Sequence, residues 1–168
     1  MRTLLSLALM LSAATAVAQG APPVRYEVEG GVLKVPGAIV FETQSATLKA
    51  ESEAALAYVK GYLDQTTYIT LLRIEGHTDS DGKPELNQAL SEKRALAVAR
   101  WLIAKGIDCK RLLPVGFGAD KPVAPNDTSE NKARNRRMAF APVMLRGKAI
   151  GGMPVDGGGR VAADPCAQ

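Results

Sequence analysis

Hydrophobic and polar positions follow two periods along the chain, and the stretches with a period of two predict strands. Residues 67–75 (TYITLLRIE) form the clearest strand, because they are rich in β-branched and aromatic side chains and end at Gly76. Residues 112–116 and 137–144 are predicted to form the next two strands. Pro142 cannot donate a ladder hydrogen bond, so it favours an edge position for the last of them.

Shorter runs of the same type precede these strands. Residues 24–29 and 32–35 flank Gly30-Gly31, so the lead-in over residues 19–35 is predicted to hold a small hairpin. Ile39–Phe41 is predicted to be a further strand, followed by a polar loop.

Two stretches repeat their apolar side chains with helical spacing. The first begins near Ser45 or Thr47, either of which is suited to cap a helix, and its apolar face consists of Leu48, Ala55, Val59 and Tyr62 or Leu63. The second runs from about Glu85 to Lys105 and ends at Gly106, a residue type that favours the left-handed conformation beyond a helix. Its buried face is predicted to consist of Leu86, Leu90, Ala97, Val98, Trp101 and Leu102.

The resulting order is strand, helix, strand, helix, strand, strand. It predicts an α+β domain over residues 36–145, a two-layer sandwich with the helices on one face of a mixed sheet. The composition then changes, since residues 146–168 are rich in glycine. This tail is predicted to be flexible, to bury little and to be held only at Cys166.

The N-terminal residues have the pattern of an export signal. Arg2 precedes the apolar run Leu4–Leu11, and Ala16-Val17-Ala18 offers the small residues that signal peptidase accepts. The uncharged stretch from Thr3 to Ala18 is shorter than the roughly 20 residues that a membrane-spanning helix needs. We therefore expect residues 1–18 to be a signal peptide cleaved before Gln19, and a periplasmic product that does not span the membrane.

Charge and cysteine content narrow the function classes. The formal net charge is +4, and the densest basic cluster consists of Lys132, Arg134, Arg136 and Arg137. Nucleic-acid binding would need a larger basic surface interleaved with aromatic side chains, whereas a modest positive balance suits a polymer that carries carboxylates. In an oxidising compartment Cys109 and Cys166 predict a disulfide, although two unrelated thiols remain an alternative. A zinc site has too few ligands, because His77 is the single histidine.

The densest polar segment is residues 76–95 (GHTDSDGKPELNQALSEKRA). Asp79 follows the end of a strand, and Asn87, Leu90 and Arg94 share one stripe of the next helix. An arginine at the border of the core needs a partner, because an unpaired buried charge is costly. Spacing alone leaves two interpretations open. Either Asp79 and Arg94 pair and hold the loop, or they stay apart and form a receptor for a zwitterion.

The same segment resembles the signature of the OmpA C-terminal-like family, which includes peptidoglycan-associated lipoproteins and flagellar motor stator proteins. The matching residues are Gly76-His77-Thr78-Asp79, Asn87, Leu90-Ser91, Arg94-Ala95 and Val98, then Val115-Gly116-Phe117-Gly118, Pro122, Asn126 and Asn135-Arg136-Arg137. The resemblance begins at Phe41-Glu42-Thr43 and covers roughly residues 36–143.

The resemblance implies non-covalent binding of peptidoglycan through the meso-diaminopimelate of its stem peptide. Asp79 would then bind the ligand ammonium and Arg94 its carboxylate, and Thr43, Gln44, Asn87 and Arg137 would complete the rim. Gln44 stands where asparagine is commoner, and Glu42 replaces an aspartate. A periplasmic protein–protein adaptor on the same fold is the alternative, so envelope proteins are possible partners beside the stem peptide.

Catalysis and cofactors are not expected. His77 lacks a second histidine, a GxSxG elbow or an HExxH motif, so it is interpreted as a structural residue of the loop. The segment Asp79–Gly82 resembles part of a calcium loop but lacks the closing glutamate.

Overall fold

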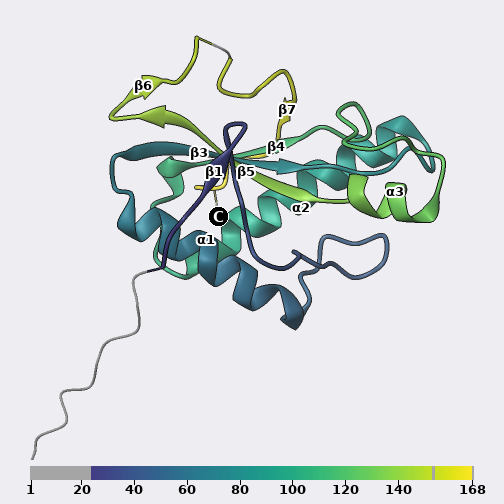
Figure 1. The fold of residues 1–168 in the computed structure, drawn as a ribbon, viewed down its shortest axis with the longest axis horizontal. Helices are drawn as coiled ribbons and strands as arrows, with labels where there is room; N and C mark the ends of the chain where they lie inside the picture. The colour runs from purple at the N-terminus through teal and green to yellow at the C-terminus, as the bar shows by residue number, and fades with distance from the viewer. Residues whose placement is uncertain (1–23, 153, 168) are drawn as a thin grey trace, which may run out of the picture.

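The computed structural model describes residues 24–152 and 154–167 (Figure 1). Its helices are α1 (Glu53–Gln65), α2 (Pro84–Ala104) and α3 (Ser129–Asn135), with short 3-10 helices η1 (Ala50–Ser52) and η2 (Cys109–Arg111). The strands are β1 (Val28–Glu29), β2 (Val32–Leu33), β3 (Ile69–Gly76), β4 (Leu112–Gly116), β5 (Met138–Leu145), β6 (Lys148–Ala149) and β7 (Arg160–Val161). The hairpin across Gly30-Gly31 is confirmed as the antiparallel pair β1–β2, shorter than predicted.

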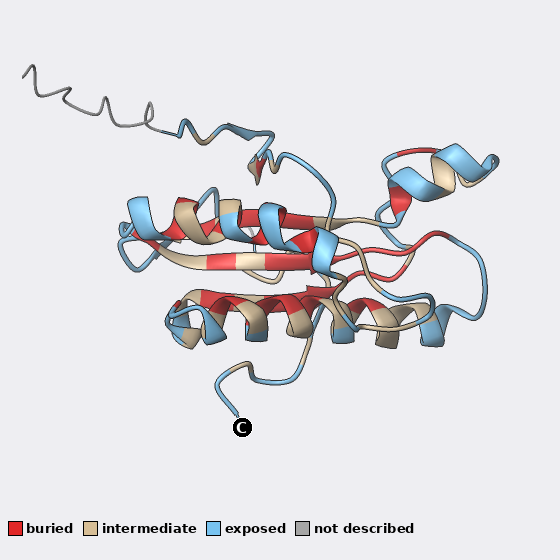
Figure 2. Cartoon of the chain, turned by 90° about the horizontal axis from the view of Figure 1, so that it is seen from below, coloured by how far each residue is buried: buried red, intermediate tan, exposed pale blue. Residues whose placement is uncertain are grey.

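The main sheet has the strand order β6-β5-β3-β4-β7 and is mixed, because β3 and β4 run parallel while the other pairs are antiparallel. Helices α1 and α2 share one hydrophobic core with β3, β4 and β5, which includes Leu63, Leu72, Val98 and Phe140. The buried positions of the helices face the strands and their exposed positions face solvent (Figure 2). The predicted α+β architecture is confirmed. No helix within the described residues has both the length and the apolar character of a membrane span.

Helix α2 carries most of the polar motif, and its ends match the sequence. Gly106 adopts φ +97°, the Gly106 N–H donates to the Ile103 carbonyl, and the Ile107 N–H donates to the Leu102 carbonyl. This pattern is a Schellman motif, in which glycine avoids the strain of the left-handed conformation. The buried face consists of Ser91, Ala95, Val98, Ala99 and Leu102. Of the predicted buried face, Val98 and Leu102 are buried, whereas Leu90, Ala97 and Trp101 are half-buried. The prediction was wrong for Leu86, which is 64% exposed.

Two glycines at the strand ends bring the sheet unusually close to α2. A Cβ atom at Gly76 would collide with the Ser91 carbonyl, and one at Gly116 would lie 2.6 Å from Ser91 Oγ. Glycine is required here by proximity rather than by its dihedral angles. The loops that follow β3 and β4 are therefore held directly beside the N-terminal half of α2.

The predicted strand Ile39–Phe41 is wrong, because this segment lies outside the sheet. Ser52 Oγ accepts a hydrogen bond from the Val40 N–H (2.8 Å) and donates to the Val40 carbonyl (2.9 Å), which satisfies both groups without a neighbouring strand. Phe41 forms only an isolated bridge with Leu48. Helix α1 begins at Glu53 rather than near Ser45, since the polar residues after Phe41 form a loop.

Two features near the C-terminus of the domain also differ from expectation. Helix α3 lies between β4 and β5, where the predicted order has no helix, and its cap is Thr128, because its Oγ1 accepts from the Asn131 N–H. Strand β5 lies between β3 and β6 rather than at the edge. Strand β6 pairs only with Met144 and Leu145 of β5. Among the described residues, Pro142 therefore has a strand neighbour on one side only, which is β3.

The tail over residues 146–168 was predicted to be held only at Cys166. This was wrong for residues 148–152 and 154–162, which we call the strap. The strap supplies β6 and β7 at opposite edges of the sheet, and Figure 1 shows the segment between them on the side of the sheet away from α1. Arg73 Nη1 donates to the Val155 carbonyl (2.9 Å), and Lys121 Nζ donates to the Gly157 carbonyl (2.6 Å). Backbone groups at unpaired sheet edges hold the segment, and its hydrophobic pattern does not reveal them. As predicted, no described side chain of the strap is fully buried.

The predicted disulfide is present and joins Cys109 to Cys166, 57 residues apart in sequence. It links η2, next to the start of β4, to the segment that follows β7. The bond therefore closes the strap back onto the domain.

Replacing both Cys109 and Cys166 by serine is expected to lower the free energy of unfolding by at most about 4 kcal/mol, because the open chain gains conformational entropy. Urea unfolding of the oxidised wild type and the double variant measures the difference. Reduced wild type is the control and should match the variant. Equal stability of the oxidised wild type and the variant would contradict the expectation.

Candidate functional site

A pocket of about 1160 Å³ lies between the loop after β2, the loop after β3, the first half of α2 and the start of β5. Its charged lining residues are Glu42, Asp79, Asp81, Lys83, Lys93, Arg94, Arg136 and Arg137. All six residues predicted for the site line this pocket: Thr43, Gln44, Asp79, Asn87, Arg94 and Arg137. The fold thus brings the six predicted residues to one pocket, although they extend from Thr43 to Arg137 along the chain.

Asp79 lines the pocket and is only 7% exposed. Its Oδ2 accepts from Arg136 Nη1 (2.5 Å), and its Oδ1 accepts from the Asp81 N–H (3.0 Å). The backbone before it is anchored because the Thr78 N–H donates to the Gly118 carbonyl. The carboxylate is therefore fixed in position and has a cationic partner within the chain.

Arg94 reaches the same pocket from α2. Its Nε donates to the Ser45 carbonyl (2.9 Å), and its guanidinium lies 4.9 Å from the ring centroid of Phe41. Within residues 24–152 and 154–167, its two Nη groups make no hydrogen bond to protein. Burial lowers the pKa of Arg94, the charge of Arg136 lowers it further, and Asp79 opposes both.

Asp79 and Arg94 therefore do not pair with each other. Asp79 pairs with Arg136, while Arg94 is held by a backbone carbonyl and an aromatic face. Of the two interpretations that spacing left open, the direct ion pair is wrong. Arg136 was missing from the predicted site, and its only signal was its place in the Asn135-Arg136-Arg137 motif of the basic cluster.

Asn87, Gln44 and Arg137, which were also predicted for the site, line the pocket around Asp79 and Arg94. Asn87 Nδ2 donates to the carbonyls of Asp79 (3.2 Å) and Asp81 (2.8 Å) and so fixes the loop after β3. Gln44 adopts φ +53°, a left-handed conformation that is uncommon for a residue other than glycine. Arg137 donates to the carbonyls of Asn135 and Lys121, and burial lowers its pKa.

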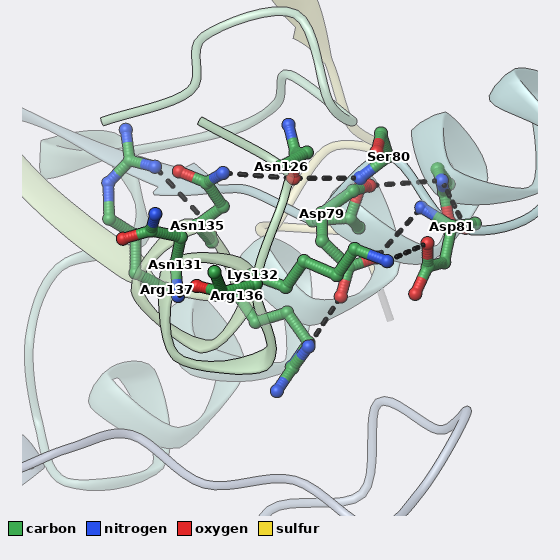
Figure 3. Close-up of polar contacts among 12 residues, drawn as sticks. Asp79, Ser80, Asp81, Asn126, Asn131, Lys132, Asn135, Arg136 and Arg137 are labelled. Atoms are coloured by element: carbon green, nitrogen blue, oxygen red, sulfur yellow. Dashed lines mark hydrogen bonds and ion pairs between the residues drawn. The ribbon is translucent and has the colours of Figure 1, made fainter. Parts of the chain in front are cut away.

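The loop after β3 is clamped to the segment around α3 (Figure 3). The Ser80 N–H donates to Asn126 Oδ1 (3.2 Å), which also accepts from Asn135 Nδ2 (2.9 Å). Lys132 Nζ lies 2.7 Å from Asp81 Oδ1. The carboxylates of Asp79 and Asp81 thus face cations of this segment, an arrangement unlike that of a calcium loop.

Comparison with known proteins identifies the family. The sequence model of the OmpA family matches residues 40–136, which are more than half of the chain. The chain belongs to the OmpA family. The resemblance drawn from the motifs is confirmed.

Relatives and solved structures agree with this membership. The probable lipoprotein YiaD of Escherichia coli strain K12 is 39% identical over 107 residues, which cover 64% of this chain and 48% of YiaD. The peptidoglycan-associated lipoprotein of Mesorhizobium japonicum is 34% identical over 99 residues, 59% of this chain and 58% of that protein. The chain thus spans about half the length of these curated relatives.

The structure of the peptidoglycan-associated lipoprotein from Burkholderia pseudomallei matches with a TM-score of 0.56 at 32% identity, over 61% of this chain and 86% of that one. The cell wall anchor of the T6SS from Pseudomonas aeruginosa matches with a TM-score of 0.56 at 28% identity, over 63% of this chain and 75% of that one.

In this OmpA-family domain, His77 occupies a structural position. It is 2% exposed, its ring stacks on Phe117 with centroids 5.1 Å apart, and its Nε2 lies 3.1 Å from Glu75 Oε2. Burial lowers the pKa of His77, although Glu75 opposes the shift. For Glu75, burial favours the neutral form, but hydrogen bonds from His77 and Arg73 outweigh it and lower its pKa.

Acidification should destabilise the fold through His77. Its folded-state pKa lies below the ordinary 6.5, so the unfolded chain binds the proton more tightly and stability falls as the pH drops below about 6.5. For one proton, the expected slope is at most about 1.4 kcal/mol per pH unit. Chemical unfolding of wild type and His77→Gln between pH 7.5 and about 5 measures it.

Glu75 does not confuse this measurement, because its lowered pKa makes it destabilising only on further acidification, below its ordinary 4.5. Glutamine keeps a donor for Glu75 but does not titrate. The variant should therefore show a flat profile over the upper range. A variant slope equal to that of wild type would assign the effect to another group.

Proposed function

We propose that this protein binds peptidoglycan non-covalently, through the meso-diaminopimelate of the stem peptide and without a cofactor. The observation that carries the proposal is that Asp79 and Arg94 line one pocket but are not paired with each other. An anion and a cation kept apart in this way match a ligand group that has an ammonium and a carboxylate on one carbon.

Arg94 is suited to the carboxylate. The Ser45 carbonyl and the Phe41 ring fix the plane of its guanidinium, so little conformational freedom remains to be lost on binding. Its two Nη groups offer parallel donors, which bind a carboxylate in a two-pronged geometry that lysine cannot reproduce.

Asp79 is suited to the ammonium. Its carboxylate is nearly buried, and a charge-assisted hydrogen bond is stronger where water is excluded. The other lining charges are mostly positive, because two carboxylates face four cations: Glu42 and Asp81 against Lys83, Lys93, Arg136 and Arg137. This balance favours a stem peptide, which carries carboxylates along its length.

The names of related proteins support the same function. Two curated relatives are peptidoglycan-associated lipoproteins, and one structural neighbour is a cell wall anchor. We further propose a periplasmic location, from the export signal predicted in residues 1–18, which lie outside the described residues.

Binding to purified sacculi should depend on both charged residues. Asp79→Ala and Arg94→Ala are each expected to weaken binding roughly tenfold or more, because each removes a charge-assisted hydrogen bond. Co-sedimentation with sacculi measures the bound fraction. Asp64→Ala on α1 and Arg100→Ala on the exposed side of α2 are matched controls with the same changes in charge. Wild-type binding with no loss in either site variant would place the contact elsewhere, as an adaptor function would.

The ligand chemistry is tested with short peptides. A lysine-type stem lacks the carboxylate beside the side-chain amine, so it leaves Arg94 unpaired and should bind about tenfold more weakly than a diaminopimelate-type stem. Arg94→Lys should bind the diaminopimelate-type stem poorly, because one point charge replaces the two-pronged donor. Calorimetry with matched stem peptides measures both effects. Equal affinity of wild type for the two stems would exclude the proposed ligand.

A further inference from the structure

Arg136 has a position that the proposed ligand contacts do not explain. Its Nη1 lies 2.5 Å from Asp79 Oδ2, with side-chain exposures of 47% for Arg136 and 10% for Asp79. In this structure the carboxylate assigned to the ligand ammonium is thus already paired with a cation of the chain. A ligand ammonium that binds Asp79 has to replace Arg136.

The Arg136 side chain is able to leave without disrupting the fold. Its backbone N–H donates to the Lys132 carbonyl and so anchors the residue at the end of α3. Within the described residues, the pair with Asp79 is the only side-chain hydrogen bond that Arg136 makes. By contrast, the neighbouring Arg137 is held by two carbonyls.

The exchange affects two kinds of ligand unequally. Asp79, Arg94 and Arg136 together carry a net charge of +1 at the pocket. An isolated ammonium exchanges one ion pair for another and is repelled by both guanidinium groups, so it gains little. A zwitterion offers Arg94 a carboxylate, and the displaced Arg136 stays beside the pocket and attracts the same carboxylate.

We propose that Arg136 is a specificity-determining residue, which disfavours ligand ends that carry only an ammonium and favours those that pair an ammonium with a carboxylate. This inference rests on the proposed function. It assigns selectivity to competition for Asp79 inside the protein, in addition to the direct contact of Arg94 with the ligand. Specificity in this form comes as much from opposing the wrong ligand as from attracting the right one.

The test is the affinity ratio between matched diaminopimelate-type and lysine-type stem peptides, measured by calorimetry. Arg136→Gln should raise the affinity for the lysine-type stem more than that for the diaminopimelate-type stem. The ratio should therefore fall by about threefold or more. Arg134→Gln is the matched control, because Arg134 is an exposed residue of α3 and its loss changes the net charge equally. Its ratio should equal that of wild type.

Charge-preserving and alternative variants complete the test. Arg136→Lys keeps the cation and should retain the wild-type ratio within about twofold. Arg136→Ser removes the charge as Arg136→Gln does, so the result does not depend on one substitution being tolerated.

The outcomes separate the two proposals. A wild type that binds both stems equally, or neither, contradicts the proposed function. If wild type prefers the diaminopimelate-type stem and Arg136→Gln and Arg136→Ser show an equal or larger affinity ratio, the role of Arg136 is overturned and the proposed function stands. The role of Arg136 is also overturned if Arg134→Gln or Arg136→Lys lowers the affinity ratio as much as Arg136→Gln does. The effect would then not come from the charge at position 136.

Discussion

The close approach of the sheet to α2 at Ser91 is the constraint on which the site depends. Gly76 and Gly116 end the two parallel strands, and neither position has room for a Cβ atom beside Ser91. Ser91 Oγ also accepts from the Gly118 N–H, so the loop after β4 is tied to the helix at the same point. Because both loops are held there, Asp79 comes to face Arg94 across a pocket instead of lying at a free strand end.

Around this contact, Asp79 and Arg94 are each held by other groups of the protein and do not pair with each other. Asp79 pairs with Arg136, whereas Arg94 is held by the Ser45 carbonyl and the Phe41 ring. An arginine oriented by neutral groups keeps its donors available, which a direct ion pair with Asp79 would not allow. The pair with Arg136 satisfies a nearly buried carboxylate and at the same time sets a competitor against any incoming cation.

The strap covers the side of the sheet that the helices leave open. Arg73 and Glu75 form a nearly buried ion pair there, and Glu75 in turn contacts His77. Gly159 packs against Val115 and Phe117 too closely for any larger residue, and Phe117 stacks on His77. The strap thus packs on the residues that surround His77, and burial of this histidine is the main cause of its lowered pKa.

Local patterns in the sequence determined the elements whose signal is strong and short-range. Strands β3 and β4 and helix α2 with its Gly106 cap were predictable from periodicity and end signals, and the six pocket residues were grouped by the resemblance to the family. Only the tertiary structure decided the partners. Val40 is satisfied by Ser52, the strap pairs with both sheet edges, and Asp79 selects Arg136 instead of Arg94. Hydrogen bonds and ion pairs between distant residues depend on where the chain returns in space, and spacing along the sequence does not encode that.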